Sequence, residues 1–275
     1  MREDDPFDLH AGTTDFYADA VYYEHEFQHR AADARWYAQH YVETGSPVLE
    51  LGVGGGRIAV RAVRQGATVV GLDLSETMLA YADERRLKLP KAKRERLTLV
   101  QGDMRDFDLG RTFALIGCPF NAFMHLYTAD DALRTLAAVR RHLEPGGLFI
   151  FDVLMADLDH LSRPPFKRYP GIRFRHPTYG THYTYSEQSG WDPVRQINQM
   201  WLWYTRDADA SEGPTEYCIQ LSHRYFFPQE MNLLLDVAGF EVVARFGDFD
   251  EGPLRADSES MVYLCTPKAA VGSRT

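Results

Sequence analysis

The sequence predicts an α/β fold in which a parallel sheet carries helices and is interrupted, late in the chain, by an antiparallel β insertion. Residues 46–154 alternate short apolar runs with amphipathic stretches, which is the pattern of β-α-β units. Residues 155–227 instead hold many aromatic residues that recur at every second position, as in antiparallel strands. The β-α-β pattern resumes over residues 228–267.

The first of these segments contains five expected strands and three expected helices. The strands are predicted at 47–51, 67–72, 97–101, 113–118 and 148–152, and the helices at 57–65, from Ser75 onward, and at 129–143. Gly66 ends the first helix, Ser75 is suited to cap the second, and the Pro-Gly-Gly sequence at 145–147 ends the third. Because the strands are apolar almost throughout, we expect helices on both faces of the sheet.

The remainder of the chain falls into four further parts. In the insertion we expect three antiparallel strands, at 182–185, 196–204 and 217–225, joined by turn-rich loops at 190–193 and 207–214. A helix is then expected at 229–238, before Gly239, followed by strands at 241–247 and 260–264. Residues 1–45 are expected to be helical and rich in aromatic residues, and the tail 268–275 to be frayed.

Composition and charge exclude several classes of protein. With 275 residues, 45% of them hydrophobic and 25% charged, the chain has the composition of a soluble globular protein with one large core. The net charge of −9 argues against a general nucleic-acid binder. No apolar run approaches the roughly 20 residues of a membrane helix, and the acidic start is not a signal peptide. Three widely spaced cysteines indicate free thiols and a cytoplasmic protein.

The most informative segment is Glu50-Leu-Gly52-Val-Gly54-Gly-Gly56, between the first strand and its helix. Glycines are needed where the backbone turns tightly and a ligand approaches closely. A dinucleotide-binding loop requires a third small residue at position 57, where this chain has Arg57. A P-loop requires a Lys-Ser/Thr pair after the glycines, and this chain has none there. The loop therefore indicates a different nucleoside ligand, although a nicotinamide-dependent dehydrogenase stays open as an alternative.

Two acidic residues lie at the tips of the next two strands. Asp73, seventeen residues after Gly56, can accept both hydroxyls of a ribose. Asp103 can accept a hydrogen bond from the exocyclic amine of adenine, while Met104 offers an apolar surface to the ring.

At this point the chain resembles the class I S-adenosylmethionine-dependent methyltransferases, in their small-molecule branch. The resemblance rests on VLELGVGGGRIAV (48–60), VVGLDLSETMLAYA (69–82), LVQGDMRDF (99–107) and LEPGGLFIFDV (143–153), and it covers residues 155–227 poorly. It implies a Rossmann-like, seven-stranded, mostly parallel sheet whose last two strands form an antiparallel hairpin. It also implies that residues 1–45 and the insertion 155–227 form a lid over the acceptor, and that 46–154 with 228–267 form the cofactor-binding core.

The resemblance also implies a role for individual residues toward S-adenosylmethionine and its product S-adenosylhomocysteine. Gly52, Gly54 and Gly56 would pass under the methionine moiety and ribose, and Glu50 would orient the loop and the ammonium group. Asp73 would bind the ribose diol, Leu74 and Met78 would flank adenine, and Asp103 with Met104 would hold its edge. Cys118 to Asn121 would form the floor between cofactor and acceptor.

A sulfonium is already activated, so the enzyme mainly supplies alignment and a dry site. An amine acceptor needs only to arrive unprotonated, whereas a hydroxyl or carbon acceptor usually needs a base or metal. The candidate bases are His125, which could instead fix the start of the next helix, and Glu187; His182 and His223 are further candidates, whereas Asp152 is interpreted as structural. The aromatic wall expected around the acceptor includes Tyr22, Tyr23, Tyr185 and Trp203, joined by Asn121 and His223.

Residues 25–29, His-Glu-Phe-Gln-His, match the H-E-x-x-H pattern of zinc proteases. Because the motif precedes the α/β core in a charged N-terminal segment, we interpret it as part of an amphipathic helix and expect no metal site.

The sequence therefore predicts a methyltransferase that acts on nitrogen or oxygen of a small metabolite by in-line displacement, as a monomer or homodimer and without nucleic-acid or membrane partners. Two alternatives stay open. One is a C-methyltransferase in which Glu187 removes a proton from an electron-rich alkene or ring, and the other is a non-catalytic S-adenosylmethionine binder.

Overall fold

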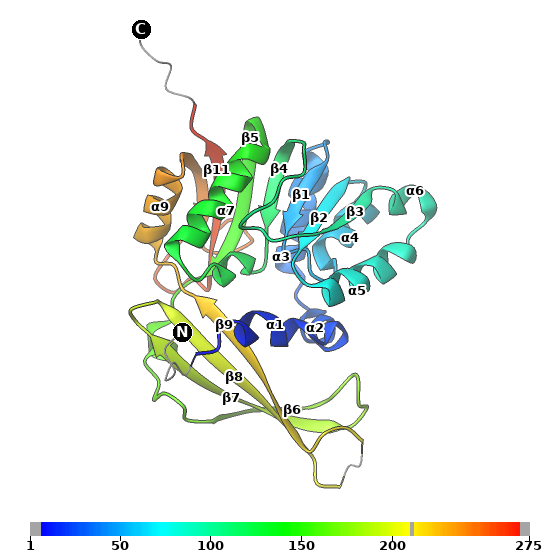
Figure 1. Ribbon diagram of the computed structural model, residues 1–275, viewed down its shortest axis with the longest axis vertical. Helices are drawn as coiled ribbons and strands as arrows, with labels where there is room; N and C mark the ends of the chain where they lie inside the picture. Colours follow the sequence, from blue (N-terminus) through cyan, green and yellow to red (C-terminus); the bar gives the residue numbers. More distant parts are fainter. Residues whose placement is uncertain (1–6, 210–211, 270–275) are drawn as a thin grey trace. The chain divides into compact units, whose positions relative to one another are not determined.

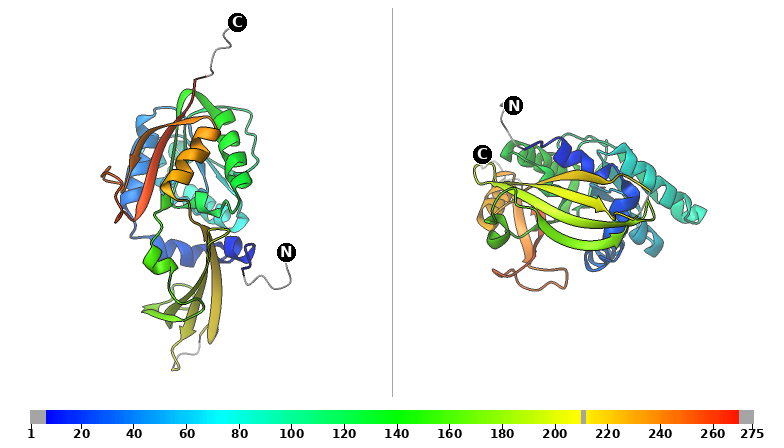
Figure 2. Two further views of the ribbon diagram at one scale, coloured as in Figure 1. Left: turned by 90° about the vertical axis from the view of Figure 1, so that its left-hand side faces the viewer. Right: turned by 90° about the horizontal axis from the view of Figure 1, so that it is seen from below.

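A computed structural model describes residues 7–209 and 212–269 of the protein, drawn in Figures 1 and 2. The chain divides into two compact units, one formed by 31–155 with 226–275 and one formed by 1–30 with 156–225. Most of the tail that we expected to be frayed lies outside the described residues. Lys268 itself is held, because its backbone N–H donates to the carbonyl of Gly239 at 2.8 Å. In the described part of the chain, no helix has both the length and the apolar character needed to cross a membrane.

The larger unit is built on a seven-stranded sheet with the order β10-β11-β5-β4-β1-β2-β3. Its strands are β1 (Val48–Leu51), β2 (Val69–Asp73), β3 (Leu97–Gln101), β4 (Phe113–Cys118), β5 (Leu143–Leu154), β10 (Phe240–Phe246) and β11 (Ser260–Pro267). Strand β11 runs antiparallel to both β5 and β10, and the other pairs are parallel. The predicted Rossmann-like sheet with a terminal antiparallel hairpin is confirmed.

Helices cover both faces of this sheet, as predicted. They are α3 (Ala32–Glu43), α4 (Arg57–Gln65), α5 (Glu76–Leu87), the short α6 (Lys91–Arg94), α7 (Ala129–His142) and α9 (Pro228–Val237), with a 3-10 turn η2 (Ala122–His125) after β4. In Figure 1, α7 and α9 lie in front of the sheet and α3 and α4 behind it. The predicted caps are present, since Gly66 ends α4 with φ of 113° and the Ser75 hydroxyl accepts the N–H of Met78 at 3.3 Å.

Strand β5 differs from the prediction at its start. It begins at Leu143 instead of residue 148, because the Pro-Gly-Gly sequence forms a bulge inside the strand and not a turn before it. The pairing with β4 changes from Phe113↔Leu143 to Leu115↔Leu148 across this bulge, and Gly146 has φ of 78°.

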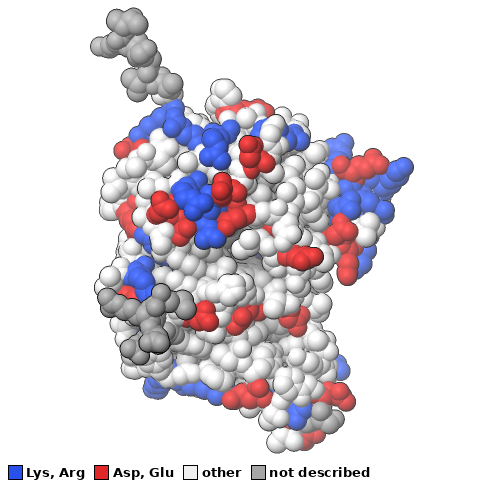
Figure 3. Space-filling view, in the orientation of Figure 1, with Lys and Arg blue, Asp and Glu red and all other residues white. Residues whose placement is uncertain are grey.

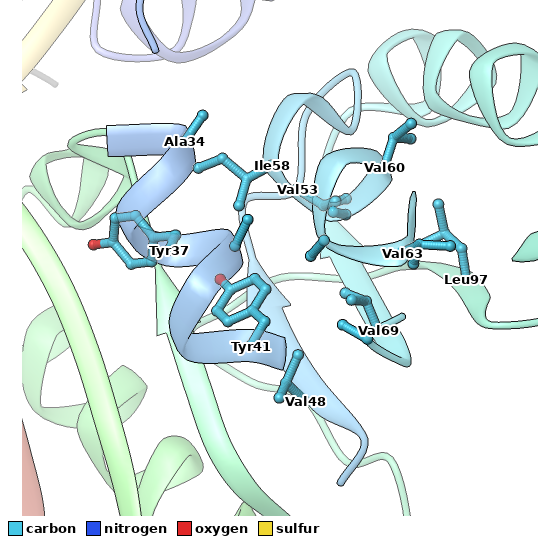
Figure 4. Packing of buried hydrophobic residues seen from close by; sticks show 14 of the residues in the cluster. Ala34, Tyr37, Tyr41, Val48, Val53, Ile58, Val60, Val63, Val69 and Leu97 are labelled. Carbon is cyan, nitrogen blue, oxygen red and sulfur yellow. The ribbon is translucent and has the colours of Figure 1, made fainter. Parts of the chain in front are cut away.

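Helix α3 packs within the larger unit, although its residues fell in the N-terminal segment that we expected to be a lid. Tyr37 and Tyr41 are fully buried in one hydrophobic cluster with Val48 of β1 and Ile58 of α4 (Figure 4). The division between the units therefore falls after Arg30, not after residue 45.

The smaller unit is a four-stranded antiparallel sheet, not the predicted three-stranded one. Its strands are β6 (Tyr169–Arg175), β7 (His182–Asp192), β8 (Ile197–Arg206) and β9 (Glu216–Arg224), in the order β6-β7-β8-β9. The missed strand, β6, is an exposed edge strand that contains Pro170 and Gly171, two residues disfavoured in strands. The unit also contains α1 (Ala11–Thr14), the 3-10 turn η1 (Asp15–Tyr17), α2 (Ala20–Phe27) and α8 (Leu158–Leu161).

Candidate functional site

The glycine loop follows β1 directly and is fixed to β2. The N–H groups of Gly52 and Val53 donate to the carbonyl of Leu72 at 2.8 and 3.1 Å. Gly52 has φ of 68°, and a Cβ there would lie 2.8 Å from the Cβ of Ala122 in η2. Only glycine meets both conditions, so the loop and the turn after β4 can approach each other closely.

Asp73, at the end of β2, holds this loop through both oxygens of its carboxylate. Oδ2 accepts the N–H of Gly54 at 2.7 Å, and Oδ1 accepts the N–H of Ser75 at 2.8 Å. Burial raises the pKa of Asp73, and these backbone donors offset part of that rise. Because each carboxylate oxygen can accept two hydrogen bonds, Asp73 can still accept from a ribose diol while it holds the loop.

The four residues expected around adenine differ in burial and in their hydrogen-bond partners. Asp103 is engaged by Arg105, whose Nε donates to both carboxylate oxygens at 3.0 Å; although burial raises the pKa of Asp103, these bonds lower it overall. Leu74 is exposed at the end of β2, and Met104 is half-buried. Met78 is buried beneath the glycine loop, with its Cε 3.3 Å from the position of a Cβ on Gly54. Contacts of these residues with adenine stay predictions.

One face of α3 carries three residues whose partners lie on other elements of the larger unit, and none of the three was among the predicted site residues. Asp33, Tyr37 and Tyr41 are spaced by four residues, so they lie above one another on the helix. Asp33 forms a buried, bidentate ion pair with Arg57, the first residue of α4. Figure 4 shows Tyr37 and Tyr41 projecting from this helix. The spacing was visible in the sequence, but the partners of these residues were not.

Asp152, at the end of β5, fixes the turn that follows β4. Its Oδ1 accepts the Tyr37 hydroxyl at 2.7 Å and the N–H of Phe120 at 2.8 Å, and its Oδ2 accepts the N–H of Asn121 at 3.1 Å. Phe120 and Asn121 both have positive φ, 56° and 62°, a conformation that non-glycine residues adopt only when neighbouring groups hold them. The guanidinium of Arg57 lies 4.7 Å from the ring centre of Phe120. The interpretation of Asp152 as a structural residue agrees with these bonds.

Glu50 is buried at 1% exposure on β1, and its Oε2 has no hydrogen-bond partner of normal geometry. The hydroxyl of Tyr41, which neighbours this carboxyl group, is likewise buried without such a partner. Burial raises the pKa of Glu50 to about 8, although the Tyr41 hydroxyl and the charge of Arg57 offset part of the rise. A buried carboxyl oxygen without a donor fits a ligand that brings an ammonium group, and together with the diol acceptors of Asp73 it fits S-adenosylmethionine.

The two remaining candidates in the larger unit are poor bases. Burial raises the pKa of Cys118, at the end of β4, so its thiol stays protonated near neutral pH. His125 is half-buried at the end of η2, with its Nδ1 3.3 Å from the Tyr127 hydroxyl, and desolvation lowers the pKa of His125 to about 4. Its imidazole is therefore neutral near pH 7 and accepts a proton only weakly.

The smaller unit divides the predicted acceptor residues between two faces of its sheet. Paired residues on neighbouring strands share a face, so Tyr185 lies with Tyr204, and Glu187 with Leu202. His223 lies on this same face, and Tyr22 of α2 packs on it with its ring 5.3 Å from that of Tyr204. Trp203 is on the opposite face, under the guanidinium of Arg168 at 4.8 Å. Tyr23 packs among Phe16, Tyr17 and Phe27. Trp203 therefore cannot share one wall with Tyr185 and His223.

The two histidines of the H-E-x-x-H pattern are not arranged as they are in a zinc site. Helix α2 ends at Phe27, so His25 and His29 do not share a helical face. Among residues 7–209 and 212–269, no group of three or more His, Cys, Asp or Glu side chains is arranged to hold a metal ion.

Comparison with known proteins connects this geometry to one family. Residues 48–147 match the family model described as "Methyltransferase domain". The cypemycin N-terminal methyltransferase of a Streptomyces species is 30% identical over 238 residues, which cover 83% of this chain and 86% of that protein.

Solved structures agree with this result. The CcbJ methyltransferase from Streptomyces caelestis is similar with a TM-score of 0.74 and 26% identity, over 86% of this chain and 90% of that one. The glycopeptide N-methyltransferase MtfA, solved in complex with S-adenosylmethionine, is similar with a TM-score of 0.56 and 25% identity, over 86% and 93% of the two chains.

Proposed function

We propose that this chain, which belongs to the class I S-adenosylmethionine-dependent methyltransferases, transfers the methyl group of its cofactor to an amine nitrogen of a small molecule. S-adenosylmethionine supplies a methyl group that its sulfonium has already activated. MtfA, whose similarity covers 86% of this chain, is named a glycopeptide N-methyltransferase, and the cypemycin relative, which covers 83%, is named for methylation at an N-terminus.

The observation that carries the proposal is that His125, Cys118 and Asp152, which lie at or just after the ends of β4 and β5, are poorly suited to act as a general base. His125 has a pKa of about 4, Cys118 is held as a thiol, and Asp152 uses its carboxylate to bind three donors. A hydroxyl or carbon acceptor would need a base in this position, whereas a neutral amine brings its own lone pair. Nitrogen is therefore the acceptor that these residues favour.

The protein's own residues then have the task of binding and alignment. Asp73 would bind the ribose hydroxyls, and Glu50 would accept from the cofactor's ammonium group. Asp152 and Tyr37 hold the turn at Phe120 and Asn121, which contacts the glycine loop through Ala122 and Gly52. Fixed loops of this kind support an in-line displacement, because its rate depends strongly on the alignment of the reacting atoms.

Transfer of an isotope-labelled methyl group tests this proposal. The purified chain is incubated with labelled S-adenosylmethionine and matched pairs of acceptors, each an amine and the alcohol of the same skeleton, drawn from amino sugars and short peptides. We expect S-adenosylhomocysteine to accumulate with amines only, and NMR to detect the label as an N-methyl group. A label on oxygen or carbon would overturn the assignment to nitrogen. If no acceptor of the panel yields S-adenosylhomocysteine, the chain acts as a binder.

A further inference from the structure

Glu187 lies among aromatic side chains of the smaller unit, beside one tyrosine hydroxyl and one histidine. Its Oε2 accepts the hydroxyl of Tyr185, two residues before it on β7, at 2.8 Å. Its Oε1 lies 3.7 Å from Nε2 of His160 in α8, and the carboxylate is 27% exposed. Among the ion pairs of residues 7–209 and 212–269, none joins Glu187 to a lysine or arginine.

Tyrosine rings surround this carboxylate. The rings of Tyr185 and Tyr204 are 5.7 Å apart, and both belong to the aromatic cluster that Tyr22 covers. Burial raises the pKa of Tyr225 to about 12, and the charges of Glu187 and Asp157 contribute to this rise. Two further carboxylates belong to this region: Asp157, whose charge raises the pKa of Tyr225, and Glu26, whose Oε2 accepts the Tyr22 hydroxyl at 3.3 Å.

A partly buried carboxylate needs an opposite charge or several donors to offset the loss of its hydration. Here it has one tyrosine hydroxyl and one histidine, which is uncharged unless protonated. The faces of tyrosine rings attract cations as well. The chemistry of this cluster therefore matches a cationic ligand.

We propose that Glu187, with the half-buried Tyr185 beside it, binds the ammonium group of a cationic amine substrate in the smaller unit. The proposal rests on the proposed amine methylation and names the charge state in which the acceptor is recognised. The substrate must carry a positive charge when it binds and an uncharged amine when it is methylated. A substrate with two amino groups meets both conditions, and so does one that binds as an ammonium ion and then loses a proton to water. The positive charge of the ammonium group pairs with the Glu187 carboxylate beside the ring of Tyr185.

Binding of fluorinated probes to the whole chain, saturated with S-adenosylhomocysteine, tests the proposal without any turnover. The probes are para-fluorobenzylammonium, para-fluorobenzyltrimethylammonium and the neutral para-fluorobenzyl alcohol, observed by fluorine NMR relaxation. We expect both cations to bind at least about tenfold more tightly than the alcohol, as a charged partner contributes more than a neutral one. Equal affinities of cations and alcohol would overturn the proposal.

Two variants locate the effect. Glu187→Gln is expected to weaken both cations by about tenfold and to leave the alcohol and S-adenosylhomocysteine unchanged. The matched control is Glu216→Gln, an exposed glutamate on β9 whose partner Thr205 lies on the opposite face of the sheet, and it should change none of these affinities. If Glu187→Gln weakens the alcohol and the cations equally, the residue shapes the wall and does not bind charge. Methylation at oxygen would overturn the proposed function, whereas the probe measurements decide this inference separately.

Discussion

Replacing Asp73 by asparagine tests the central residue of the cofactor site with a change of one atom. In the wild type, each carboxylate oxygen accepts one backbone N–H, from Gly54 at 2.7 Å and from Ser75 at 2.8 Å. Asparagine has a single acceptor oxygen, and its NH₂ group must face one of these two donors. One backbone N–H therefore loses its partner in either orientation of the amide, and one of the two positions for the ribose hydroxyls becomes a donor.

The size of the effect follows from the bonds that are lost. A hydrogen bond to a charged group contributes about 1.5–3 kcal/mol, so we expect the free energy of unfolding to fall by about 2 kcal/mol. The cofactor loses one charge-assisted bond and meets a displaced glycine loop. A binding loss of about 2.7 kcal/mol corresponds to a dissociation constant for S-adenosylmethionine about 100-fold larger.

Isothermal titration calorimetry with S-adenosylmethionine, in the absence of acceptor, measures this constant, and urea denaturation measures stability. Asp83→Asn is the matched control, because Asp83 pairs with Arg86 on the exposed side of α5. We expect the control to change stability by less than about 0.5 kcal/mol and affinity by less than about twofold. A dissociation constant for Asp73→Asn within about threefold of the wild type would refute the role of Asp73 derived from these contacts.

Three further changes test other parts of the site. Gly52→Ala should destabilise the protein by about 2 kcal/mol or more in urea denaturation, and Gly110→Ala, with φ of 62° but open space around it, should cost only about 1 kcal/mol; equal losses would contradict the close approach of the two loops. Burial raises the folded-state pKa of Glu50 to about 8, above its ordinary value of 4.5, so its contribution to stability is full below pH 4.5 and is lost as the pH rises toward 8. Without ligand, the free energy of unfolding should fall between pH 5.5 and 8, and Glu50→Gln should remove about 3 kcal/mol of this fall. If the fall is unchanged in the variant, another group causes it. Asp33→Asn removes the carboxylate that pairs with the buried guanidinium of Arg57 and should cost about 3 kcal/mol in urea denaturation, part of which the double variant with Arg57→Gln should restore.

Local sequence patterns were sufficient for the elements that surround the glycine loop. The helix at 57–65 and the strands at 97–101 and 113–118 have the predicted bounds. Each is an apolar run or an amphipathic period that ends at glycine or a polar tip, and such features act within a few residues of the chain. The place of Asp73 at a strand tip was predicted in the same way, whereas its hydrogen bond to Gly54, 19 residues earlier, was not predicted.

Features that depend on weak local preference were not predicted. Strand β6 contains Pro170 and Gly171 and forms because β7 pairs with it, as Arg173↔Thr184 and Phe174↔Tyr183 show. The Pro-Gly-Gly sequence before residue 148 reads as a turn but is held inside β5 by its pairing with β4. In both cases, tertiary pairing outweighed the local preference.

The residue pattern was enough to predict the strands of the larger sheet, its glycine loop and the acidic residues at its strand tips. The contacts of α3 could be seen only in the folded chain, because Tyr37 and Asp152 are 115 positions apart and neither has a local feature that identifies its partner. The same holds for the side chains of the insertion that share a face, since moving a strand by one residue would exchange its two faces. Local patterns record what a segment prefers, whereas contacts between distant segments are fixed by packing of the whole unit.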